Sequence, residues 1–278
     1  MQNTLQNSWS LVKASARILN EDRALLLFPL MSGIAFLALM ATFVFPAILL
    51  GGVETLFGQA RVLGFGLVFL LYLVQYFVAF YFNAALVGAA LIHLDGGRPT
   101  VQDGLQIASD HIRPILGYAA ISATVGLLLN SAGRRGRMGG RLVSGVLGTA
   151  WNLATFLAVP VLVTRDMGPI DALKESARLL KGTWGEQLSG MLGMGIAFGV
   201  MGAGLAAASV GLLVGVAGLG PFGLVPVTLF LFVFWVLFAL ATPALQGIYR
   251  AAVYRYALTG EAGEGFESIS MRDMADLG

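Results

Sequence analysis

Residues 195–216 read GIAFGVMGAGLAAASVGLLVGV and place a glycine or alanine at every fourth position. They belong to a longer stretch, 187–220, that contains no ionisable side chain and is therefore stable in the hydrocarbon of a bilayer. Small residues four apart form a smooth helix face that a second helix can approach closely. We call this face the small-residue ridge; its members are Gly195, Gly199, Ala203, Ala207, Gly211 and Gly215. The stretch predicts an integral membrane protein with at least one closely packed helix pair.

Composition extends this prediction to the whole chain. Of its 278 residues, 57% are hydrophobic and 12% are charged, against about 25% charged residues in typical soluble domains. These proportions predict an all-α bundle embedded in the membrane. The net charge of +2 and the small number of charges indicate no broadly basic surface, which argues against a nucleic-acid partner. The absence of cysteine excludes disulfides, thiolate metal sites and a cysteine nucleophile.

Six apolar stretches have the length of a membrane span, and the third is the weakest because it is short and carries Ser122 and Thr124. They run over about 24–50, 62–94, 114–129, 142–163, 187–216 and 222–249. We therefore expect a six-span membrane domain over 24–258. An amphipathic helix over 1–23 precedes it, and a flexible acidic tail over 259–278 follows it.

Two further amphipathic helices are predicted between the spans. Thr100 and Asp103 have the spacing of a capping box, and Pro169 suits the first position of a helix. All three amphipathic helices combine an apolar stripe with charged residues. This pattern is typical of helices at the headgroup level, and equally of short helices that cap the bundle.

Two similar segments of the sequence indicate an internal repeat. Residues 81–105 align with 150–173, so that Asn83 corresponds to Asn152. The two copies have the same orientation, which predicts a parallel repeat with units at about 81–129 and 150–206. With both termini in the cytoplasm, most of the 17 lysines and arginines fall on the cytoplasmic side, as the positive-inside rule requires.

One basic cluster violates this rule and is a candidate contact for anionic lipid headgroups or an acidic partner, although a solvated loop would look the same. It comprises Arg134, Arg135, Arg137 and Arg141.

No combination of residues predicts catalysis, a metal site or a cofactor. The chain has two histidines and no HExxH or GxSxG motif. Gly218, Gly220 and Gly223 spell GxGxxG, but no strand precedes them, as a dinucleotide site requires. We therefore expect a protein that is not an enzyme.

Polar side chains inside the predicted spans are the remaining candidates for function. An unpaired amide in hydrocarbon is costly, so each should face the bundle and find a partner. These residues are Gln75, Asn83, Asn152 and Gln246. They hold helices together in one interpretation and line a polar path between the repeats in the other. Charged residues at the membrane centre, which coupled transporters normally use, are lacking.

Several segments resemble a bacterial family of polytopic membrane proteins that is defined only as a domain of unknown function. They are SWSLVKASARILNEDRALLLFPLMSG (8–33), LQIASDHIRPILGYAAISATVGLL (105–128), VPVLVTRDMGPIDALKESARLLKGTWGE (159–186) and IYRAAVYRYALTGEAGEGF (248–266). The resemblance implies six spans in a bacterial inner membrane and implies no activity. The two repeated turn-and-helix blocks bear a fainter resemblance to the membrane domain of some glycerophosphodiester phosphodiesterases, which implies at most a link to lipid.

Two functions follow as hypotheses. The first is a non-enzymatic scaffold or assembly module, associated with membrane lipids, that forms a homo-oligomer through the small-residue ridge. The second is a passive channel or uncoupled transporter whose path passes Gln75, Asn83 and Asn152.

Overall fold

The computed structural model describes residues 2–45, 61–135, 150–184 and 193–266, together with 48, 147 and 148. This part of the chain is helical and contains no strand, so the predicted all-α fold is confirmed. The main helices are α1 (Gln2–Glu21), α2 (Leu27–Leu39), α5 (Arg61–Leu94), α6 (Val101–Asp110), α7 (Ile112–Arg135), α9 (Ala158–Thr164), α10 (Pro169–Trp184), α11 (Gly193–Val216) and α12 (Pro221–Thr259).

Five helical segments are long and apolar enough to cross a membrane: Arg23–Phe43, Gly66–Leu94, Ile112–Leu129, Gly199–Leu219 and Pro221–Thr259. A sixth span exists if Ala150–Thr164 and Pro169–Thr183, which meet at a bend of 118°, count as one. The chain is therefore an integral membrane protein with five or six spanning helices. The first part of the predicted fourth span, 142–146, lies outside the described residues.

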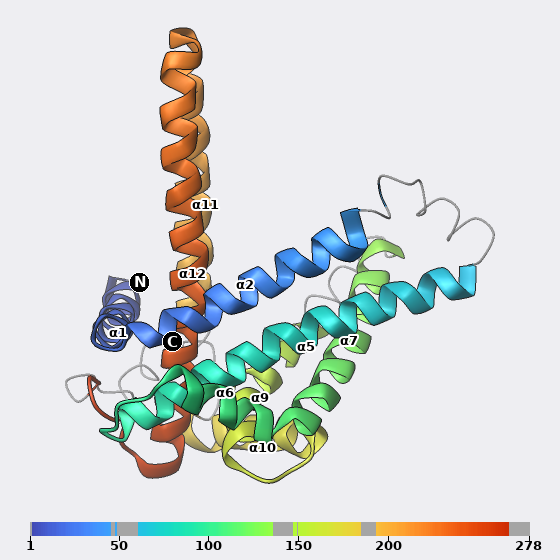
Figure 1. Ribbon diagram of the computed structural model, residues 1–278. Helices are drawn as coiled ribbons and strands as arrows, with labels where there is room; N and C mark the ends of the chain where they lie inside the picture. Colours follow the sequence, from blue (N-terminus) through green and yellow to red (C-terminus); the bar gives the residue numbers. More distant parts are fainter. Residues whose placement is uncertain are drawn as a thin grey trace.

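The core is built around α5, which runs through the body of the molecule with α2 beside it (Figure 1). Its C-terminal half buries a series of alanines, among them Ala84, Ala85 and Ala89. These small side chains let other helices approach, and Gly104 of α6 comes so near that an added Cβ would lie 2.6 Å from the carbonyl oxygen of Ala85. The close contacts that small residues allow are therefore made within one chain here.

Helices α11 and α12 form a hairpin that projects from the body (Figure 1). The Trp235 indole N–H donates a hydrogen bond to Ser209 Oγ at 3.2 Å, and the Phe238 ring faces Gly202. At 39 residues, α12 is about 58 Å long, well beyond the roughly 30 Å of a hydrocarbon core. Its first half stays exposed in the hairpin, whereas its second half, from Ala244, is largely buried in the body.

The amphipathic helices pack onto the bundle. The predicted capping box of α6 is present, because Asp103 N donates to Thr100 Oγ1 at 3.2 Å and Thr100 N donates to Asp103 Oδ2 at 2.8 Å. Pro169 is the first residue of α10. Helix α1 lies against α12 and buries Leu11 and Ile18 in the core, as a helix that caps the bundle does.

The proposed repeat stays a prediction. The second unit has the same order of elements as the first: residues 150–164, a short turn and α10 correspond to α5, its turn and α6. Residues 185–192 of the second unit lie outside the described part.

Candidate functional site

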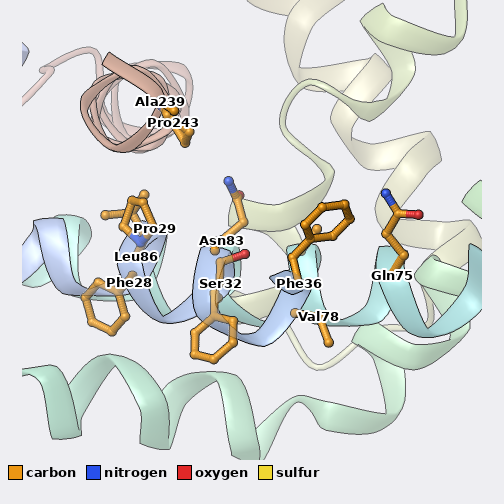
Figure 2. Close-up of a pocket in the computed structure, with 13 residues that line it drawn as sticks. Phe28, Pro29, Ser32, Phe36, Gln75, Val78, Asn83, Leu86, Ala239 and Pro243 are labelled. Carbon is orange, nitrogen blue, oxygen red and sulfur yellow. The ribbon is translucent and has the colours of Figure 1, made fainter. Parts of the chain in front are cut away.

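A cavity of about 290 Å³ lies between α2, α5 and α12 (Figure 2). Each of the three helices contributes one face to it, at the three- and four-residue spacings of a helix. The lining residues are Phe28, Pro29, Ser32, Gly33, Phe36, Gln75, Val78, Ala79, Phe82, Asn83, Leu86, Ala239 and Pro243.

Three polar side chains interrupt the apolar wall of this cavity. Asn83 and Gln75 extend from α5 in the same direction, and Ser32 lies on α2 (Figure 2). The amide oxygen of Asn83 is buried and accepts no hydrogen bond from the described residues. A buried acceptor without a donor is uncommon in folded proteins and calls for an explanation. None of the lining residues is charged.

Helix α12 contributes a second acceptor, a backbone carbonyl without its usual helical donor. Pro243 lies inside this helix and has no N–H, so the carbonyl of Ala239, four residues earlier, lacks its helical donor. Both residues line the cavity. A side-chain acceptor on α5 and a backbone acceptor on α12 therefore belong to walls of the same cavity.

Two apolar side chains of the cavity wall pack directly on glycines of neighbouring helices. Phe28 is fully buried between the cavity and α6, where an added Cβ at Gly104 would lie 2.5 Å from its ring. Leu86 of α5 likewise packs directly on Gly247 of α12. Larger residues at either glycine would push these walls into the cavity.

The predicted intramembrane polar residues divide into two groups. Gln75 and Asn83 line the cavity together. Asn152 is exposed and Gln246 is half-buried, and neither of them lines it. Sequence reasoning missed Ser32 and Pro243, which become neighbours of Asn83 only when α2 and α12 pack on α5; the proline inside an apolar run was the available signal.

From Gly199 onward, the small-residue ridge faces away from the part of the chain that the structure describes. Gly199, Ala203, Ala207, Gly211 and Gly215 are all exposed. An added Cβ at Gly199, Gly211 or Gly215 would meet no atom within 4 Å. The face of α11 that α12 covers carries instead Gly202, Leu205, Ser209 and Leu213, on the opposite side of the helix. Gly195 lies in the first turn of α11, and its surroundings are not described.

A cluster of charged groups lies outside the cavity, at the place at which α1, the end of α5 and the end of α12 meet. His93 is buried between two carboxylates, with Nδ1 2.5 Å from Asp22 Oδ2 and Nε2 3.7 Å from Glu21 Oε2. Arg255 Nε donates to Asp95 Oδ1 at 2.7 Å. These contacts connect three elements, and among the described residues no three His, Asp or Glu side chains form a metal site.

The first part of the predicted flexible tail is packed rather than free. Ala262 and Phe266 are buried, and Glu264 N donates to the carbonyl of Leu94 at 3.1 Å. Phe266 anchors this part because its burial removes a large apolar surface from water. Residues 267–278 lie outside the described part.

The basic cluster falls largely outside the described residues. Arg134 and Arg135 end α7, but their side chains are not described, and Arg137 and Arg141 lie in the undescribed segment that follows. Their proposed contact with anionic lipid stays a prediction.

Comparison with known proteins identifies one family. The model of a family of unknown function, DUF6159, matches residues 62–266, which is most of the chain. No curated protein and no solved structure matches. The fainter resemblance to the membrane domain of glycerophosphodiester phosphodiesterases therefore stays a prediction.

Proposed function

Because the chain belongs to the DUF6159 family, whose function is unknown, we propose a function from its geometry: a non-enzymatic, lipid-associated scaffold or assembly module that self-associates through the small-residue ridge of α11. The observation that carries this proposal is the outward direction of the ridge. Lipid tails gain nothing from a glycine stripe, whereas a second helix gains close packing. Within the described part of the chain, no helix covers this face.

The shape of the molecule supports the same proposal. The α11–α12 hairpin projects from the body (Figure 1), and the ridge is exposed from Gly199 to Gly215, so a second copy can reach this part of it. Pairing of two ridges would give an isologous contact, the commonest arrangement in homodimers. We further propose that the protein lies in a bacterial inner membrane, as the resemblance to a bacterial family implies. Both termini would then be in the cytoplasm, because most lysines and arginines lie on the cytoplasmic side in that orientation.

The test compares two neighbouring alanines of α11. Ala207 belongs to the ridge, whereas Ala208 is equally exposed but points about 100° away around the helix. We expect Ala207→Leu and Gly199→Leu to separate the subunits of a wild-type oligomer, and Ala208→Leu to leave them together. Native mass spectrometry of protein released from lipid nanodiscs counts the subunits. A monomeric wild type, or an oligomer that survives Ala207→Leu, would overturn the proposal.

The alternative, a passive channel or uncoupled transporter past Asn83 and Asn152, draws support from the amides in the cavity but not from Asn152, which lies outside it. Since the chain has no cysteine, single cysteines at positions 75, 83 and 152 test a water-filled path directly. Labelling of all three by a membrane-impermeant thiol reagent would favour a channel. Protection of positions 75 and 83 would exclude it and favour the scaffold.

A further inference from the structure

We propose that the cavity between α2, α5 and α12 binds an uncharged, hydroxyl-bearing lipid of the monoacylglycerol class. Its hydroxyl groups donate hydrogen bonds to Asn83 Oδ1 and to the Ala239 carbonyl, and its chain lies against the phenylalanines of the wall. This inference rests on the proposed function only in taking the chain to be lipid-associated, and it names the lipid and its site.

Two acceptors, one on α5 and one on α12, define the polar end of the ligand. Asn83 Oδ1 is buried and has no donor among the described residues, and the carbonyl of Ala239, an exposed residue, lacks the helical N–H that Pro243 does not possess. In hydrocarbon, a bound molecule that supplies hydrogen-bond donors can satisfy acceptors of this kind. A glycerol head with two free hydroxyls supplies one donor for each wall.

The absence of charge in the wall sets the charge of the ligand. None of the thirteen residues that line the cavity is ionisable. A phosphate, carboxylate or ammonium group would enter an apolar site without an ionic partner, which is strongly unfavourable. The cavity therefore selects neutral heads over the charged heads of phospholipids and fatty acids.

The apolar part of the wall suits an acyl chain. Phe28, Phe82 and Leu86 line it beside Asn83, and Phe36 and Gln75 are exposed and form part of an open side. A volume of about 290 Å³ is close to the lower end of small-ligand sites, roughly 300–1,000 Å³. It accommodates a glycerol head and the start of one chain. The three lining helices are all candidate spans, so the remainder of the acyl chain of the ligand extends into the bilayer.

The first experiment needs no variant. Full-length protein in nanodiscs is incubated with 1-monooleoylglycerol, with its di-O-methyl ether and with oleate, and native mass spectrometry measures the bound fraction of each. The ether keeps the chain but has no donor, and oleate adds a charge. We expect at least a tenfold preference for the monoacylglycerol, the order of magnitude for losing a hydrogen bond to a buried acceptor such as Asn83 Oδ1. Equal binding of the ether would overturn the proposal. So would a cavity that binds none of the three lipids and holds only water.

Matched substitutions then locate the site. Asn83→Leu removes the side-chain acceptor, and Asn152→Leu is the same change at an exposed asparagine outside the cavity. Gly33 lines the cavity and Gly66 lies outside it, and an added Cβ meets no atom within 4 Å at either position. We expect Asn83→Leu to weaken binding about tenfold and Gly33→Leu to abolish it. Asn152→Leu and Gly66→Leu should bind as the wild type does, and equal losses in a matched pair would overturn the assignment.

The backbone acceptor has its own test. Pro243→Ala supplies the missing N–H to the Ala239 carbonyl, so the ligand loses one partner while the helix gains a hydrogen bond. We expect weaker binding in a more stable protein, a combination that damage to the fold would not produce. Pro226→Ala, at the other proline inside α12, is the control. Unchanged binding in Pro243→Ala would remove Ala239 from the site.

The same spectra separate this inference from the proposed function. Subunit count reports on the ridge, and lipid occupancy reports on the cavity. A monomeric Ala207→Leu protein that still prefers monoacylglycerol would support both the oligomer proposal and the lipid-site proposal. A monomeric wild type that binds monoacylglycerol would support the lipid site and overturn the oligomer. An oligomer that shows no preference among the lipids would support the ridge contact and overturn the lipid site.

Discussion

Helices α5 and α11 are both long, apolar and rich in small residues, yet half of the apolar part of α5 is buried and none of that of α11. At Gly88 of α5, an added Cβ would lie 2.8 Å from Ile107 of α6, whereas at Gly211 of α11 it would meet nothing. Small residues at helical spacing therefore mark faces suited to close packing. Their pattern does not tell whether the partner belongs to the same chain, because both helices carry the same signal.

The largest expected effect comes from placing one substitution in each region. Gly104→Leu forces a side chain into Ala85 and Phe28, and we expect it to lower the free energy of unfolding by about 3 kcal/mol. Gly204→Leu in α11 enters open space and should change it by less than about 0.5 kcal/mol. Any gain in helix propensity is common to both variants. Unfolding titrations with SDS in mixed micelles measure the difference, and equal losses would show that the hairpin is packed as tightly as the body.

The sequence predicts those parts of this comparison that depend on neighbours along the chain. Apolar length identified the spans, and the capping box of Thr100 and Asp103 formed as expected because its partners are three residues apart. Local order also located Pro169 at the start of α10. The ridge of α11 was recognisable, but its outward direction depends on where α12 packs.

The candidate site was predictable only in part, for the same reason. Gln75 and Asn83 stood out because amides are rare in apolar runs, and their spacing of eight residues places them on one face of α5. Asn152 carried the same signal but lies outside the cavity. Ser32 and Pro243 come from helices far away in the sequence, so no local pattern joined them to Asn83. Long-range packing decides which polar residues share a site.

A smaller effect distinguishes the polar contacts of the two regions. In the hairpin, Trp235 donates to Ser209 among apolar side chains; in the body, Tyr81 Oη and Ser109 Oγ, 2.7 Å apart, are bonded where water can compete. Double-mutant cycles with Trp235→Phe and Ser209→Ala should give a coupling of about 0.6–1.7 kcal/mol. Tyr81→Phe with Ser109→Ala should give less than about 0.5 kcal/mol. A larger coupling in the body would contradict the view that the hairpin is the drier region.

The smallest effect is the response to acid, which should reach the body and not the hairpin. Hydrogen bonds from the Thr100 hydroxyl and backbone N–H hold the pKa of Asp103 below its ordinary value of 3.8. A carboxyl group whose pKa falls on folding stabilises the folded state above its unfolded pKa, and this contribution is lost as the pH falls through the folded pKa. The first turn of α6 should therefore loosen only below about pH 3.8. Residues 187–248 contain no Asp, Glu, Lys, Arg or His, so α11 has nothing to titrate there.

Carbon NMR of labelled Asp103 measures the midpoint of this titration, and Thr100→Ala should move it upward because the hydroxyl that stabilises the carboxylate is gone. Amide hydrogen exchange, corrected for its intrinsic pH dependence, should rise in α6 while that of α11 stays constant. A midpoint at or above the ordinary value would mean that the capping box does not persist in the membrane. Equal acid sensitivity of α11 would mean that the loosening of α6 spreads through the body to the hairpin.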